Sequence, residues 1–378
     1  MSARHAWYPS PDQELLLRAA LLPGEAAERA WVQWREAHWD EQFDPGSFRL
    51  LPLVYRNLAT LGSDDAWLGR LKGIYRRAWF LNQSLLHWGA GVVGRLEAAG
   101  VPTLLLKGAG LSLAHYRDLG VRPMDDLDVA VPLDRRRAAI DELLAAGLRA
   151  ESPFTDEQLA YVHAEEFAGP DGRRLDLHWS VLWRPGADDG LWHESVPVEL
   201  HGTATRTLSP TDHLFHACDH GVYWSPIHPL RWVADVHVIL RSGAIDWERL
   251  VQRALDREAT LSVEQALRYM HERFGADLPD GLLSRLARER VRPLRRVAHR
   301  VAGLPPSRTR SVGMVALYLD MYRAGARVAG GRPSTRGFIR HLQRHAGVDG
   351  PRQLAARGVR ILSRRDARRD ANPVMARR

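Results

Sequence analysis

Cysteine is almost absent from this chain of 378 residues, because Cys218 is the only one. A single cysteine excludes an intrachain disulfide and any metal centre built from several thiolates. No run of about 18 apolar residues occurs, which excludes a membrane-spanning helix. The opening stretch MSARHAWYPSPDQE lacks the apolar segment of a signal peptide. We therefore predict a cytoplasmic protein without a membrane partner.

Lysine is also scarce. Lys72 and Lys107 are the only two, although lysine and arginine together number 53 against 45 acidic residues. The net charge of +8 suits a phosphorylated partner, and freely used surface arginine explains it equally well. A compact ammonium fits between phosphate groups better than a planar guanidinium does. The retained Lys107 therefore indicates a phosphate contact, with accidental codon usage as the alternative.

The stretch from Val101 to Val131 contains the pattern on which the remaining predictions depend. Val101–Leu106 is apolar and predicts a short buried strand, and helical spacing predicts a helix from Ala109 to about Leu119. Small residues between them allow a sharp turn, and the amide groups of a helix N-terminus attract phosphates. The predicted nucleotide-binding turn consists of Lys107, Gly108, Ala109 and Gly110.

A second strand is predicted at residues 126–131, after chain breaks at Gly120 and Pro123. Alternate side chains of a strand share a face, so Asp126 and Asp128 point the same way. Two adjacent carboxylates repel each other unless a cation lies between them. A hard divalent ion fits this geometry, and we predict Mg²⁺, with Mn²⁺ as the alternative.

A hairpin is predicted further along, where residues 164–167 and 174–179 flank a turn of the Asp-Gly type at 169–172. The second run alternates, which places Asp176 and His178 on one face. His178 is either a contact of the nucleotide or the acceptor, or a histidine whose hydrogen bonds are satisfied within the sheet.

Two common nucleotide-binding motifs do not fit the glycine turn. A dinucleotide-binding motif needs a third glycine where Leu113 stands, and a P-loop needs its lysine after the glycines, whereas Lys107 precedes them. Both classes are therefore disfavoured.

The segments LLLKGAGLSLAHY and RPMDDLDVAV resemble the DNA polymerase β-like nucleotidyltransferase superfamily and, within it, a family of uncharacterised nucleotidyltransferases. The likeness extends from about Phe48 to Trp247. It implies an α+β fold, in which a small mixed β-sheet core is flanked by N-terminal and C-terminal helical regions. It further implies transfer of a nucleoside monophosphate from an NTP, such as ATP, to an acceptor. Asp126, Asp128 and Asp176 would be catalytic and would bind the metal ions.

The resemblance has one departure, because the superfamily turn is Gly-Ser and this chain has Gly108-Ala109. Ser112 would replace the absent hydroxyl, or it is a serine on the helix surface. Arg122 would reach the triphosphate, or it forms a surface ion pair with Asp118 or Asp125. Asp125 itself is expected to be exposed.

The chain after Pro210 is predicted to be wholly helical. His213, His216 and His220 recur at spacings of three and four, so they share a helix face. They would form a zinc site or, more commonly, lie as polar residues beside a cleft. Arg231 and Asp235 are one turn apart and are expected to form an ion pair within their helix.

Four regions are predicted: an N-terminal helical region at 1–95, a catalytic core at 96–205, a C-terminal helical region at 206–350 and an arginine-rich solvated tail at 351–378. Three functions compete. The first is a nucleotidyltransferase whose acceptor is a small molecule, a protein or RNA. The second is an inactive nucleotide-binding or scaffold protein of the same fold, which the missing turn serine suggests. The third is a metallohydrolase built on the histidine helix.

Overall fold

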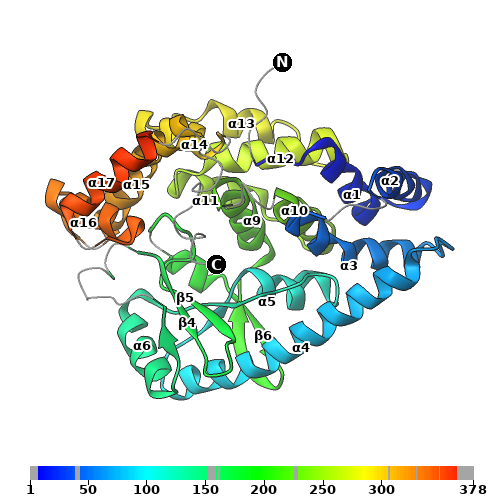
Figure 1. Cartoon of the computed structure of the whole chain (residues 1–378), viewed down its shortest axis with the longest axis horizontal. Coiled ribbons are helices and arrows are strands. Elements are labelled where there is room, and N and C mark those ends of the chain that lie inside the picture. Colours follow the sequence, from blue (N-terminus) through cyan, green and yellow to red (C-terminus); the bar gives the residue numbers. More distant parts are fainter. Residues whose placement is uncertain are drawn as a thin grey trace.

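The computed structural model describes residues 7–38, 43–151, 159, 162–186, 188–224, 229–304, 307–328, 330–348 and 350–363. It combines helices with a seven-stranded mixed sheet, so the predicted α+β class is confirmed. Figure 1 shows the sheet between the long helix α4 and an arc of helices that extends from the N-terminal helices to α16 and α17.

The N-terminal region consists of α1 (Pro11–Leu21), α2 (Gly24–Ala37), α3 (Pro45–Thr60) and α4 (Leu68–Ala98). Local chemistry fixes where two of these helices begin. Ser10 precedes α1 and forms a capping box with Gln13, in which the side chain of each residue accepts a hydrogen bond from the backbone amide of the other. The side chain of Asp44 accepts amide bonds at the start of α3. The predicted N-terminal region is therefore helical, and its last helix, α4, leads into the sheet.

The strands are arranged in the order β3-β4-β5-β2-β1-β7-β6. Strand β2 lies between β1, with which it is antiparallel, and β5, with which it is parallel. The predicted hairpin is confirmed as the antiparallel pair β4 and β5. The strand bounds are β1 Leu104–Leu105, β2 Leu127–Ala130, β3 Arg149–Ala150, β4 Ala164–Ala168, β5 Arg174–His178, β6 Val196–Leu200 and β7 Thr203–Thr207.

The β6–β7 hairpin was not predicted, although the sequence contains a signal for it. His201 and Gly202 connect the strands with φ values of 45° and 83°, as in a type I′ turn. The run Thr203–Thr207 alternates threonine with other residues, as a strand does. Strand β7 then pairs with β1 and completes the sheet beside the glycine turn.

The glycine turn differs from the prediction in two respects. Helix α5 (Lys107–Leu111) passes into a π-helical turn, η1 (Ser112–Tyr116), so the helix ends before Leu119. The left-handed backbone belongs to Lys107, with φ 39°, and neither Gly108 nor Gly110 has a positive φ. After β2, the 3-10 turn η2 (Leu133–Arg135) leads into α6 (Arg136–Ala145).

After Pro210 the described chain is helical, as predicted. The short α8 (Asp189–His193) precedes it. The remaining helices are α9 Pro210–Trp224, α10 Pro229–Ser242, α11 Trp247–Asp256, α12 Thr260–Phe274, α13 Leu282–Arg288, α14 Pro293–Ala302, α15 Arg308–Val328, α16 Thr335–Ala346 and α17 Pro351–Ser363. The predicted tail thus begins as a helix, and its remainder lies outside the described residues. Within the described chain, no helix has both the length and the apolarity needed to cross a membrane.

One hydrophobic cluster joins the two helical regions. It contains Trp31 and Leu51 from the N-terminal helices together with Phe215 and Val263 from the C-terminal helices. The indole of Trp232 on α10 also donates a 3.0 Å hydrogen bond to the carbonyl of Trp7. A second cluster fills the space between the sheet, α4 and α6. The helical regions therefore share one core above the sheet, although the predicted region boundaries remain predictions.

Candidate active site

Two aspartates from neighbouring strands lie side by side at the centre of the sheet. Asp128 on β2 and Asp176 on β5 occupy opposed positions of the parallel pair. His178 Nε2 lies 3.0 Å from Asp176 Oδ2 and 3.2 Å from Asp128 Oδ1. The possible ligand atoms of these three residues are all within 4.8 Å of one another. The strand alternation predicted from the sequence therefore brings two of the three proposed catalytic carboxylates together.

Lys107 provides the positive charge of this cluster. Its Nζ lies 2.5 Å from Asp128 Oδ1 and 3.6 Å from Asp176 Oδ2. Burial by itself would lower the pKa of Lys107, but the charges of Asp128 and Asp176 outweigh burial and raise it above its usual range. The ammonium thus contacts carboxylates in this structure, and its predicted contact with phosphates remains a prediction.

Asp126 lies just before β2 and is half-buried. Burial and the negative charge of Asp128 raise the pKa of Asp126. Asp128 behaves oppositely: burial would raise its pKa, but Lys107 and His178 lower it. The charges of Asp128 and Lys107 act on Asp126, yet Asp126 is not one of the three residues whose ligand atoms converge. Its predicted role as a metal ligand therefore remains a prediction.

His178 bridges the two carboxylates from a buried position. Burial would lower the pKa of His178, but the charge of Asp176 prevails and raises it above 6.5. Its other ring nitrogen, Nδ1, is buried and has no hydrogen-bond partner among the described residues. When protonated, the imidazole is a second internal cation for the aspartate pair.

Metal-free protein should lose stability as pH rises, partly because of His178. A raised folded pKa means that the proton on His178 stabilises the folded state below 6.5 and is lost as pH rises through the folded value. One such group contributes at most about 1.4 kcal/mol per pH unit. His178→Asn should remove this contribution from melting curves recorded in EDTA between about pH 6 and pH 9. His193→Asn is the control, because the side chain of His193 is 85% exposed, and it should leave the dependence of stability on pH as in wild type. An equally steep dependence in His178→Asn would contradict the expectation.

The glycines of the turn are surrounded by protein. A Cβ atom on Gly108 would lie 2.7 Å from the sulfur of Met124, and one on Gly110 would lie 2.7 Å from the backbone oxygen of Leu105. Ala109 is also buried. Glycine is thus required for tight packing of the turn against the sheet, and contact of its backbone with a nucleotide remains a prediction.

Gly110→Ala should destabilise the protein by about 1–3 kcal/mol, the usual effect of overpacking. The added methyl would lie 2.5 Å from Thr207 Oγ1 and would also meet the Leu105 backbone, which cannot move alone. Urea unfolding measures the change. Gly91→Ala is the matched control, because a Cβ there meets nothing within 4 Å and alanine favours the interior of α4 by roughly 0.5–1 kcal/mol. Equal stability of the two variants would contradict this packing argument.

Ser112 was expected to be on the helix surface if it does not bind nucleotide. That alternative is wrong, because Ser112 is fully buried. Its Oγ also has no hydrogen-bond partner among the described residues. A contact between this hydroxyl and a nucleotide remains a prediction.

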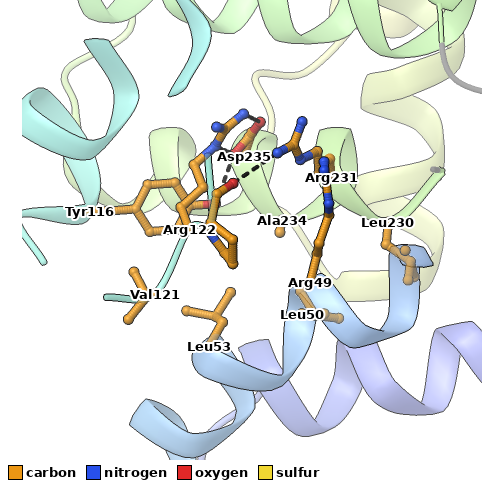
Figure 2. A pocket seen from close by; sticks show the side chains of 12 residues that line it. Arg49, Leu50, Leu53, Tyr116, Val121, Arg122, Leu230, Arg231, Ala234 and Asp235 are labelled. Carbon is orange, nitrogen blue, oxygen red and sulfur yellow. Dashed lines mark hydrogen bonds and ion pairs between the residues drawn. The ribbon is translucent and has the colours of Figure 1, made fainter. Parts of the chain in front are cut away.

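Arg122 forms a buried ion pair that the sequence analysis did not anticipate. Its Nε and Nη2 donate to the two oxygens of Asp235 at 2.8 and 2.9 Å (Figure 2). The expected surface pair with Asp118 or Asp125 is therefore wrong. Asp118 instead pairs with Arg56, and the exposed Asp125 pairs with Arg49.

The expected ion pair within α10 is wrong for the same reason. Asp235 is occupied by Arg122 and by the hydroxyl of Tyr116, which donates to it at 2.8 Å. Arg231 turns away and donates its Nη2 to the carbonyl of Pro123 at 2.8 Å. Figure 2 shows these groups in a small pocket between α3, α10 and the chain before β2.

The three histidines of α9 do not converge on a common point. His213 lies 3.0 Å from His115 through its Nδ1, and the rings of His216 and His220 stack with centroids 5.4 Å apart. In the part of the chain that the structure describes, the only group of three possible metal ligands is the one at Asp128. The zinc interpretation of this helix, and the metallohydrolase that depended on it, therefore lose their support.

His216 nevertheless borders the aspartate cluster. Burial, with the charge of Lys107, lowers the pKa of His216 to about 3. Its Nε2 is buried and has no hydrogen-bond partner among the described residues. The charges of Lys107, His178 and Asp128 thus act on one histidine of this helix, and its predicted place beside a cleft remains a prediction.

The fold and this carboxylate pair define a nucleotidyltransferase-like core, and comparison with known proteins agrees. Residues 47–275 match the model of the family described as uncharacterised nucleotidyltransferase, and the chain belongs to that family. The predicted resemblance and the prediction of a transferase are thus confirmed. No curated protein matches the sequence significantly.

Solved structures give more distant similarities. A solution structure of the antibiotic-resistance factor ANT(2″)-Ia is 17% identical, covers 51% of this chain and 98% of its own, and has a TM-score of 0.35. A crystal structure of ANT(2″)-Ia with adenylyl-2″-tobramycin is 15% identical over 46% and 98%, with a TM-score of 0.34. A nucleotidyltransferase-like protein from Paracoccidioides brasiliensis is 14% identical over 53% and 95%, with a TM-score of 0.37.

Proposed function

We propose that this protein is a metal-dependent nucleotidyltransferase that moves a nucleoside monophosphate from an NTP to an acceptor and releases pyrophosphate. The observation that carries the proposal is the in-register pair of Asp128 and Asp176 on adjacent parallel strands. Family membership supports the same reaction class. The acceptor is a small molecule, a protein or RNA, because a fold does not determine its substrate.

The donor set fits a divalent cation. Two ionised carboxylates with ligand atoms within 4.8 Å of each other need positive charge between them. Asp128 and Asp176 would hold the ion, with Asp126 completing the set that the superfamily pattern implies. Carboxylates suit both Mg²⁺ and Mn²⁺, and the imidazole of His178 is a donor that Mg²⁺ uses less readily. When bound, such an ion neutralises phosphate charge and lowers the pKa of an acceptor hydroxyl.

The residues of the chain have separate tasks in this proposal. The acceptor oxygen attacks the α-phosphorus, and the bond to the pyrophosphate oxygen breaks. Asp176 helps to take the proton of the acceptor, since it lies at the half-buried side of the pair. Lys107 and the amides of the turn that it begins, with Gly108, Ala109, Gly110 and Ser112, orient the phosphates.

The proposed compartment is the cytoplasm. Cys218 is buried, and a single thiol suits a cytoplasmic compartment.

Two observations favour the second candidate, a protein that binds nucleotide without catalysing its transfer. Ala109 stands where the superfamily turn has serine, and Lys107 Nζ lies between the carboxylates that would hold the ion. Such a protein would bind NTP, yet it would label no acceptor.

Isothermal titration with ATP, CTP, GTP and UTP in Mg²⁺ and in Mn²⁺ tests the common part of both candidates. We expect at least one NTP to bind, and Asp126→Asn to weaken that binding. Absence of binding to folded protein with all four nucleotides would contradict the proposal. Transfer of radiolabel from the bound NTP to a lysate component then separates the enzyme from the inactive binding protein.

A further inference from the structure

Arg231 is a cation whose charge is not neutralised by a carboxylate. Its Nη2 donates to the backbone oxygen of Pro123, and no carboxylate oxygen of the described residues lies within 4.0 Å of its guanidinium. Asp235, one turn along α10, is occupied by Arg122. Burial and the nearby charge of Arg122 lower the pKa of Arg231. A half-buried guanidinium without a neighbouring carboxylate is expected to be stabilised by a bound anion.

The position of Arg231 relates it to the aspartate cluster. Pro123, which it contacts, lies three residues before Asp126. The charges of Asp126 and Asp128 are among those that act on Arg231. Arg231 therefore contacts the segment that leads into Asp126 and β2.

Arg49 approaches the same segment from the opposite helical region. It forms an ion pair with Asp125, the residue next to Asp126. Figure 2 shows its side chain extending from α3 towards Arg231 on α10. Arg49 and Arg231 thus flank residues 123–126, one from each helical region. Of the three arginines lining this pocket, Arg49 and Arg122 each pair with an aspartate, and Arg231 pairs with none among the described residues.

We infer that Arg231, with Arg49 beside it, binds the phosphate chain of the NTP at the Asp126 side of the site. This inference rests on the proposed function. A guanidinium presents several donors in a plane and matches phosphate oxygens in a bidentate manner. Arg122 is less suited to this task, because two of its nitrogens are bound to Asp235.

The test compares Arg231→Gln with wild type in titrations with ATP, CTP, GTP and UTP, with the corresponding monophosphates, and with inorganic tripolyphosphate, all in Mg²⁺. Arg241→Gln is the matched control, because Arg241 is an exposed arginine on the same helix. Loss of one charge-assisted phosphate contact should weaken NTP and tripolyphosphate binding about 10- to 100-fold. Monophosphate binding should change much less, and Arg241→Gln should match wild type.

The possible outcomes separate the inference from the proposed function. If wild type binds no NTP, the proposed function fails. If wild type binds NTP and Arg231→Gln binds it equally well, or loses monophosphate affinity to the same extent, the inference alone fails. Circular dichroism and melting establish that each variant is folded. If Arg231→Gln does not fold, Arg49→Gln and Arg231→Lys take its place: we expect a selective loss of NTP and tripolyphosphate affinity in both, and unchanged affinity in both would overturn the inference.

Discussion

Replacing Asp128 with asparagine is expected to weaken the binding of Mn²⁺ by about 100-fold or more. Mutating a residue that only hydrogen-bonds to a metal ligand typically lowers metal affinity 10- to 100-fold, and loss of a ligand should cost at least as much. Asp128 is the residue on which the cluster converges. Its carboxylate contacts both Lys107 and His178, and its backbone position opposes Asp176. Asparagine keeps the shape of the side chain and removes the negative charge, so Asp176 alone would have to hold the ion against the positive charge of Lys107. Titration with Mn²⁺ measures the loss directly.

The control for Asp128→Asn is Asp134→Asn. Asp134 also carries one negative charge, but its side chain is 79% exposed and lies outside the site. Its replacement should leave Mn²⁺ affinity within roughly twofold of wild type, because exposed charges are screened. Equal affinities of the two variants would show that the ion does not bind at the aspartate pair.

Asp235→Asn is expected to reduce the free energy of unfolding by about 3–5 kcal/mol, the usual result of removing one partner of a buried ion pair. The side chains of Arg122 and Asp235 are each only 9% exposed. Asparagine would still accept one hydrogen bond from Arg122, but the guanidinium would remain buried without a counter-charge. Since this pair joins the core to α10, urea unfolding should show the loss in the main transition.

An exposed ion pair provides the comparison for Asp235→Asn. Arg137 and Asp141 pair at 3.3 Å on α6, with side chains 59% and 57% exposed. Asp141→Asn should change the free energy of unfolding by less than about 0.5 kcal/mol. A similarly small effect of Asp235→Asn would mean that Arg122 finds another anion, and it would contradict the structural role assigned to this pair.

The aspartate pair could be predicted because its geometry depends on local periodicity. Alternation in a strand predicts a shared face for Asp176 and His178, and both side chains meet at Asp128. The same rule was applied to Asp126, which lies just before β2 and is not one of the converging residues. The family resemblance implied that Asp176 shares a site with the Asp126–Asp128 segment, and the structure places Asp176 opposite Asp128 on adjacent parallel strands. The helical regions were predictable for a similar reason, since apolar spacing along a helix is also local.

Contacts between distant segments could not be predicted in this way. The partner of Arg122 lies 113 residues away on α10, whereas sequence reasoning offered only its near neighbours Asp118 and Asp125. Arg231 was assigned to Asp235 by helical spacing, and the competing buried pair decided otherwise. Ser112 was misjudged because the π-helical turn and the sheet behind it bury it. The β6–β7 hairpin could have been predicted, because His201-Gly202 is a turn signal between two strand-like runs.

The most direct measurement is transfer of label from α-³²P NTPs in the presence of a cell lysate and Mg²⁺ or Mn²⁺. Wild-type protein should label an acceptor only when the divalent ion is present. The double variant Asp128→Asn/Asp176→Asn, confirmed as folded, should label none. Labelling by the double variant at the wild-type rate, or by wild type in excess EDTA, would contradict the claim that this aspartate pair carries metal-dependent nucleotidyl transfer.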